Sequence, residues 1–168
     1  YQLFHRAHAL KAGQTILFQA AAGGVGLIAC QWARHIGAAL IGAVGAEEKT
    51  AAVLDNGAAH AIVYTSDDVA ERVREITGGR GCDAVFDAVG KDTIEASVKS
   101  LATFGTLVRY GDISGDVSSK LADLPVSTYL FKMSIMTLLR QPGEYQAAAA
   151  AVFDLAASGA LDFSSPQT

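Results

Sequence analysis

The sequence lacks the features that mark several classes of protein. It has only two cysteines, Cys30 and Cys82, and no CxxC pair, which argues against a disulfide framework or a cysteine-rich metal site. No apolar run reaches the roughly 18 residues of a membrane span, because the longest candidate, residues 16–30, is interrupted by Gln19 and three glycines. We therefore expect a reducing, cytoplasmic location, with both cysteines as small core residues.

Charge is also scarce. The 168 residues include 13 basic and 17 acidic side chains, which give a net charge of -4, and the basic residues form no cluster. This balance argues against nucleic acid as the main partner. Hydrophobic residues make up 51% of the chain, which excludes a disordered protein. The length suits a single domain that buries roughly 70% of its unfolded surface.

Short apolar runs alternate with amphipathic stretches from one end of the chain to the other. Five runs are apolar on both faces, as strands covered by helices on both sides should be. They are residues 15–20, 38–44, 61–64, 82–87 and 105–110. A sixth candidate strand, residues 134–138, is weaker and could equally be a helical turn.

Helical patterns lie between these runs, at residues 1–10, 25–36, 46–56, 66–77, 93–100 and about 142–158. Gly57 suits the end of one helix, Ser66 the N-cap of the next, and Asp92 with Glu95 resembles a capping box. The polar stretch 111–125 is typical of a surface loop. Strands that alternate with helices predict right-handed crossovers and a parallel sheet with helices on both faces.

The loop after the first predicted strand, AAAGGVG at residues 20–26, is the most informative segment. Aligned on the dinucleotide-binding pattern GxGxxG, Ala21, Gly23 and Gly26 take the three glycine positions. Small residues are needed because the chain turns tightly, approaches a pyrophosphate and packs its helix close to the strand. The positive end of that helix would hold the phosphates. The alternative is a tight turn used only for packing.

Other nucleotide-binding classes fit less well. A P-loop is excluded because no GK[ST] follows the glycines, and a short-chain reductase is disfavoured because the chain has no Tyr-x-x-x-Lys pair. A methyltransferase that uses S-adenosylmethionine would want an acid at the end of the second strand. That strand ends in small residues.

The end of the second strand also bears on the choice of dinucleotide. Enzymes that bind NAD usually place Asp or Glu there to accept from the ribose hydroxyls, whereas this chain has Gly45. A 2′-phosphate would fit at Gly45, with Lys49 one turn into the next helix, so NADPH is favoured. Glu47 and Glu48 could instead repel a phosphate or accept from the ribose, although acids also suit the first turn of a helix.

Four longer runs resemble one known family. In order, AAAGGVGLIACQWAR, IGAVGAEEK, VYTSDDVAERVREITGGRG and CDAVFDAVGKDT resemble the zinc-independent quinone oxidoreductases, the zeta-crystallin-like branch of the medium-chain dehydrogenase/reductase superfamily. The resemblance covers residues 10–161 and implies a doubly wound Rossmann α/β fold, with six parallel strands in the order 3-2-1-4-5-6. Because members also have a catalytic domain built on a partly open barrel, residues 1–168 are expected to be one NAD(P)-binding domain of a longer enzyme.

The resemblance also implies roles by position. Ala22 and the run Gly23, Gly24, Val25 and Gly26 match the pyrophosphate loop. Gly45 matches the small residue that replaces the NAD-selecting acid. Lys49 and Tyr64 match a lysine and a tyrosine that flank the 2′-phosphate, although Tyr64 could be an ordinary strand-end aromatic.

Two further segments match the nicotinamide end of the site. Val89, in the run after the fourth strand, matches backbone beside the nicotinamide ribose, whereas Asp87 in the same run is better explained as a cap for the next turn. Tyr110 and Gly111 match backbone near the nicotinamide. The family often has Phe and Asn around this site, so Tyr110 and Asp112 are departures from it.

The activity that the resemblance implies is hydride transfer from NADPH to a quinone or an activated alkene, without zinc. We nominate no acid, base or nucleophile, and His5 and His8, one helical turn apart, lack a third metal ligand. We expect the chain alone to bind NADPH weakly and to turn over little. A homodimer through the edge strand at residues 134–138 is also expected. The alternative function is a stand-alone module that senses NAD(P)(H).

Overall fold

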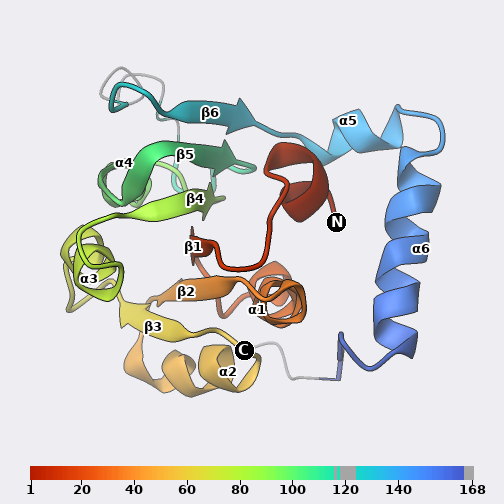
Figure 1. Ribbon diagram of the computed structural model, residues 1–168, viewed down its shortest axis with the longest axis horizontal. Coiled ribbons are helices and arrows are strands. Elements are labelled where there is room, and N and C mark those ends of the chain that lie inside the picture. The colour runs from red at the N-terminus through yellow and green to blue at the C-terminus, as the bar shows by residue number, and fades with distance from the viewer. Residues whose placement is uncertain (116, 118–123, 165–168) are drawn as a thin grey trace.

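Six parallel strands form the centre of the molecule, in the order β3-β2-β1-β4-β5-β6 (Figure 1). The structure is a computed structural model that describes residues 1–115, 117 and 124–164. The strands are β1 (Thr15–Phe18), β2 (Ala39–Val44), β3 (His60–Val63), β4 (Cys82–Asp87), β5 (Leu101–Arg109) and β6 (Tyr129–Lys132). This order confirms the predicted doubly wound fold.

Helices connect the strands and cover both faces of the sheet. They are α1 (Gly24–Ile36), α2 (Thr50–Asp55), α3 (Val69–Ile76), α4 (Ile94–Lys99), α5 (Ile135–Leu139) and α6 (Glu144–Ala157), with a short π-helix η1 (Leu3–Ala7) and a 3-10 turn η2 (Glu47–Lys49). α6 runs along one end of the sheet in Figure 1. In the part of the chain that the structure describes, no helix combines the length and apolarity needed to cross a membrane.

Alternate residues of each strand face two separate cores. Phe18 and Phe86 lie in the core that α1 and η1 cover, and their rings stack with centroids 5.7 Å apart. Leu17 and Val85, one residue earlier on the same strands, lie in the core beneath α3 and α4. All four side chains are fully buried. This two-sided burial explains why the strands are continuously apolar in sequence.

The strand order reverses between β1 and β4. The chain moves outward from β1 to β3, then returns to pair β4 with the other side of β1, with Leu17 opposite Val85. The loops after β1 and β4 therefore leave the carboxyl edge of the sheet on opposite faces. Doubly wound sheets bind ligands in the crevice that this reversal opens.

The predicted sixth strand is wrong. Residues 134–138 fall mainly in helix α5, whereas the edge strand β6 is Tyr129–Lys132. Ser134 favours the helix because its hydroxyl accepts from Met136 N at 3.3 Å and its carbonyl accepts from Thr137 N at 3.0 Å. β6 escaped prediction because its side chains are exposed, so it lacks the buried pattern of the other strands.

Strand β5 begins four residues before the predicted start at Gly105. Its pairing with β4 shifts between Cys82 and Ala84, so that Leu101 and Thr106 face residues only two apart. Phe104, in this irregularity, has a left-handed backbone with φ +64. Because of this irregular pairing, the first part of β5 lacks the regular strand pattern and was not predicted. Of the predicted loop at residues 111–125, residues 116 and 118–123 lie outside the described part of the chain.

Helix ends also differ from the prediction. Asp68, rather than Ser66, caps α3, because its Oδ1 accepts from Glu71 N at 3.0 Å. The predicted capping box at Asp92 and Glu95 is wrong, since the N-cap of α4 is Thr93, which makes no side-chain cap bond. The predicted helix at residues 46–56 is divided into η2 and α2, and only Leu3–Ala7 of residues 1–10 is helical. Gly57 follows α2 with φ +104, as expected.

Candidate dinucleotide-binding site

The glycine loop joins β1 to α1 at the carboxyl edge of the sheet. Gly23 is the N-cap of α1, and the first helical bond is donated by Leu27 N to Gly23 O at 2.9 Å. The first turn of α1 contains no acidic side chain. Its backbone N–H groups and the positive end of the helix are therefore not neutralised by a carboxylate of that turn.

Gly26 brings α1 against the loop. A Cβ on Gly26 would lie 2.3 Å from the carbonyl oxygen of Ala21, which is far closer than side-chain atoms approach backbone. Ala21 in turn is held to β2, since its N–H donates to Ala43 O at 3.0 Å. The packing role predicted for the third glycine position is confirmed.

At the end of β2, Gly45 and Tyr64 meet. A Cβ on Gly45 would lie 2.6 Å from the Tyr64 hydroxyl, so the tyrosine ring covers the position where an NAD-selecting acid would stand. Tyr64 is 45% exposed. Lys49 ends the η2 turn one residue before α2 and is partly buried, whereas Glu47 and Glu48 are exposed.

Asp87 organises the loop between β4 and α4. Its side chain is fully buried and accepts from the backbone of Val89 at 2.9 Å and Gly90 at 3.0 Å, and from the hydroxyls of Thr93 and Ser97 at 2.8 and 2.7 Å. These bonds hold Val89 at the carboxyl edge. They confirm that Asp87 caps the turn that follows it.

Tyr110 and Gly111 pack against the same loop from the end of β5. Tyr110 N donates to Asp87 O at 3.1 Å, and a Cβ on Gly111 would lie 2.7 Å from Ala88 O. Burial, and then the nearby Asp87 carboxylate, raise the pKa of Tyr110. Asp112, which departs from the family pattern, forms an ion pair with the buried Arg109 of the preceding strand β5.

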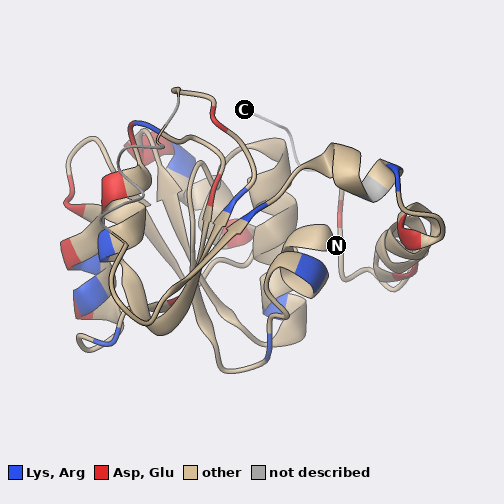
Figure 2. Ribbon diagram, turned by 90° about the horizontal axis from the view of Figure 1, so that it is seen from above, with Lys and Arg blue, Asp and Glu red and all other residues tan. Residues whose placement is uncertain are grey.

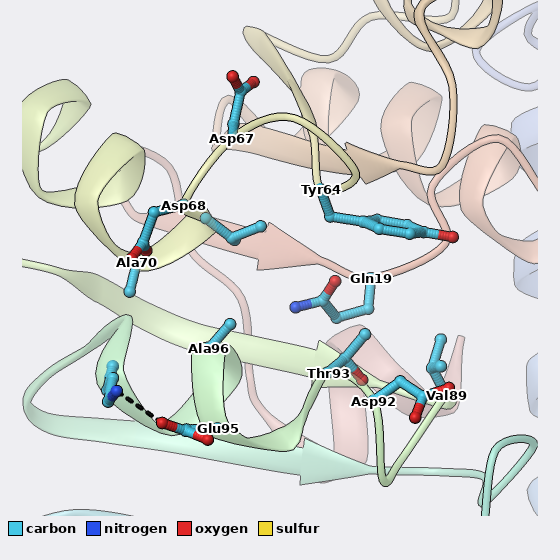
Figure 3. A pocket seen from close by; sticks show the side chains of 12 residues that line it. Gln19, Tyr64, Asp67, Asp68, Ala70, Val89, Asp92, Thr93, Glu95 and Ala96 are labelled. Carbon is cyan, nitrogen blue, oxygen red and sulfur yellow. Dashed lines mark hydrogen bonds and ion pairs between the residues drawn. The ribbon is translucent and has the colours of Figure 1, made fainter.

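Two cavities lie at the carboxyl edge of the sheet. The first, about 370 Å³, is lined by Tyr64 and Val89 together with Gln19, which the sequence analysis did not assign to the site (Figure 3). The second, about 530 Å³, is lined by Val25 and Tyr110 and by apolar residues of α6. Both volumes are in the range of small-molecule sites. Four of the predicted residues thus line these two cavities, Tyr64 and Val89 the first and Val25 and Tyr110 the second.

Two residues missed in the sequence left weak signals. Gln19 is a polar residue that interrupts an apolar run, and Arg109 is a charge inside one, and both side chains are buried. A polar side chain near the end of a buried strand can belong to a binding site, or it can mark the point where the chain leaves the core for solvent. Only the fold distinguishes these cases.

The histidines and cysteines have structural surroundings. His5 stacks on Tyr1 with ring centroids 4.6 Å apart, whereas His8 hydrogen-bonds Thr106 and Gln14 at 3.3 Å. Both cysteines are fully buried, and burial raises the pKa of each thiol to about 12. Among the described residues, no group of three or more His, Cys, Asp or Glu side chains is placed to hold a metal ion.

Acidic and basic side chains are mixed over the surface. In Figure 2 both signs occur side by side on the helices at one end of the molecule, and no basic stripe crosses the described residues in this view. The glycine loop itself, residues 20–26, contains only Ala, Gly and Val and therefore no charged side chain.

The strand order, the reversal at β1 and β4 and the glycine loop at the start of α1 define a Rossmann-type α/β domain. Residues 24–154 match the family described as zinc-binding dehydrogenase. The chain belongs to this family of oxidoreductases, within the medium-chain dehydrogenase/reductase superfamily.

Several proteins similar to this chain are named as reductases. The chain is 41% identical over 164 residues to a quinone oxidoreductase of Salmonella typhimurium, covering 96% of this chain and 50% of the relative. It is 39% identical over 170 residues to a 2-haloacrylate reductase of Burkholderia, covering 99% and 51%. The solved Escherichia coli quinone oxidoreductase complexed with NADPH superposes with a TM-score of 0.89 at 39% identity, covering 96% and 51%. The chain therefore spans about half the length of the relatives that it matches.

Proposed function

We propose that this chain binds NADPH along the carboxyl edge of its sheet, as the cofactor-binding part of a reductase. The observation that carries the proposal is the end of β2, where the Tyr64 ring covers Gly45 in place of an acid. The first turn of α1, which has no side-chain cap bond, and the two cavities at this edge add support. An Escherichia coli relative of the same fold is a quinone oxidoreductase complexed with NADPH.

Each part of the edge has a physical task in this proposal. Backbone N–H groups of residues 24–26 donate to the pyrophosphate, because no side chain of the N-cap occupies them. The ammonium group of Lys49 and the hydroxyl of Tyr64 bind the 2′-phosphate next to Gly45. When bound, NADPH supplies a hydride from C4 of its nicotinamide ring. Val25 and Tyr110 line the cavity that we assign to the nicotinamide end, together with apolar residues of α6.

The acceptor that we propose is a quinone or an activated alkene, reduced without zinc. Relatives named quinone oxidoreductase and 2-haloacrylate reductase support this class of acceptor. The zinc-free mechanism rests on the sequence resemblance. Since the chain spans about half of these relatives, we expect it to bind NADPH weakly on its own and to reduce little quinone. We also propose a reducing, cytoplasmic location, in keeping with two buried, free cysteines.

Calorimetric titration with NADPH and NADH tests the cofactor assignment. The chain should prefer NADPH, and Lys49→Ala should weaken NADPH binding roughly tenfold or more, because a charge-assisted contact is lost. NADH binding should not change, since NADH has no 2′-phosphate. Lys11→Ala is the matched control, because Lys11 precedes β1 at the opposite edge of the sheet. Equal or better binding of NADH would reject the phosphate site and move the ribose contact to Glu47 or Glu48.

We further propose that the protein is a homodimer in which β6 is the pairing strand. β6 ends the sheet, with β5 on one side only, and Tyr129, Leu130 and Phe131 are exposed on it. An exposed apolar edge strand is a template for pairing with another chain. This assignment replaces residues 134–138, which are mainly helical, as the dimer contact.

A further inference from the structure

The first cavity is lined by a residue with a buried polar atom that no described residue hydrogen-bonds. Gln19 follows β1 and is 1% exposed. Its Nε2 donates to Ser97 Oγ at 3.0 Å, whereas Oε1 has no hydrogen-bond partner among the described residues. Burying an acceptor without a donor costs folding free energy, so such atoms are rare in native proteins.

The orientation of the Gln19 amide follows from its neighbours. Ser97 Oγ donates its only hydrogen to Asp87 Oδ2 at 2.7 Å, because a carboxylate can only accept. Ser97 therefore accepts from the Gln19 side chain, which puts Nε2 next to Ser97 and Oε1 on the other side. In Figure 3 the amide lies among the side chains that line the cavity, with its oxygen on the Tyr64 side.

The lining of this cavity suits a flat, neutral ring that carries a hydrogen-bond donor. Its walls combine the aromatic ring of Tyr64, on which a base can stack, with small or apolar side chains. Its rim is acidic, and the ammonium of Lys99 is bound to Glu95 at 2.7 Å. Such a rim disfavours a phosphate group and favours a ligand group that donates hydrogen bonds. The apolar members are Val69, Ala70, Val89 and Ala96, and the acidic ones are Asp67, Asp68, Asp92 and Glu95.

We propose that Gln19 Oε1 accepts a hydrogen bond from the exocyclic amine of the adenine base, and that it selects dinucleotides with adenine over those with hypoxanthine. Hypoxanthine has a carbonyl oxygen in place of this amine, so two acceptors would face each other. A site built around a buried hydrogen bond rejects an analogue that cannot make it. The inference rests on the proposed NADPH site and adds a base-selecting residue to it. Ser97 acts through Gln19 as a positioning residue.

The test compares NADPH with its hypoxanthine analogue by calorimetric titration. The wild-type chain should bind NADPH at least about tenfold more tightly than the analogue, as expected when a buried acceptor loses its donor. Gln19→Met keeps the shape of the side chain but removes the acceptor. It should reduce the preference to about twofold or less, by weakening NADPH alone. Gln146→Met, on the exposed face of α6, is the matched control and should keep the wild-type ratio.

Ser97→Ala is a second variant that keeps Gln19 but frees its amide to turn, and it should also reduce the preference. Thermal unfolding of each variant shows whether the fold persists. The ratio of the two affinities in the wild-type chain tests the inference even if a variant does not fold. Equal binding of both dinucleotides by the wild-type chain overturns the inference and leaves the NADPH site standing. A preference that survives Gln19→Met also overturns it. Binding of neither dinucleotide overturns the proposed function, and the inference with it.

Discussion

Gly23 and Gly26 are three residues apart in one loop but have different surroundings. A Cβ on Gly23 would lie 3.4 Å from Ala20 O, an ordinary contact, whereas one on Gly26 would lie 2.3 Å from Ala21 O. Position 23 therefore has room for a side chain within the fold and is open to a ligand. At position 26 the fold itself requires glycine.

This contrast predicts that alanine at position 26 affects mainly stability, whereas alanine at position 23 affects mainly NADPH binding. Gly26→Ala should lower the free energy of unfolding by roughly 2 kcal/mol or more, because backbone must move to admit the methyl group. Gly23→Ala should cost no more than about 1 kcal/mol, the difference between Gly and Ala at an N-cap, but should weaken NADPH binding. Urea unfolding and calorimetry separate the two effects. Equal stability of the two variants would mean that the loop does not pack as described.

At the site, some residue roles could be predicted from the sequence and others could not. The pyrophosphate loop and the absence of an acid at Gly45 follow from local pattern. The contact between Gly45 and Tyr64 does not, because it joins the ends of β2 and β3, which pair only in the folded sheet. The role of Gln19 likewise depends on Ser97, which is distant in sequence.

At the scale of elements, the strands inside the sheet and the edge strand β3 were predictable, but the opposite edge strand β6 was not. β1, β2 and β4 lie inside the sheet, are mostly apolar and are buried at every position but one each, so their sequences reveal them. β6 is exposed along its length, and exposure removes the pattern on which prediction relies. The same exposure makes β6 the candidate surface for association.

The dimer proposal predicts a specific loss of association. Leu130→Lys puts a charge at the pairing edge, and in a symmetric dimer each interface would carry two such charges. The dimer dissociation constant should rise roughly tenfold or more. Leu54→Lys, on α2 and similarly exposed, should have no effect. Sedimentation equilibrium measures both. A wild-type chain that remains monomeric at all concentrations, or equal effects of the two variants, would reject β6 as the contact.

At the scale of the whole molecule, the two cores fix where a ligand can bind. Buried side chains fill both faces of the sheet, so the open space lies at the carboxyl edge, where the loops after β1 and β4 diverge. The cavity with Tyr64 and the cavity with Val25 and Tyr110 both lie at this edge, and Val25 belongs to the glycine loop. A dinucleotide that crosses this loop can place one end in each.

The measurement that tests this account most directly is the shift of backbone amide resonances in the ¹⁵N-labelled chain during titration with NADPH. This method suits a 17.4 kDa chain and remains informative when binding is weak. We predict saturable shifts concentrated at residues 23–26, Gly45, Tyr64 and Val89, with little change at Gly13 and Gly81 near the amino ends of β1 and β4. Shifts confined to those amino ends or to β6, or no saturable shift, would contradict the account.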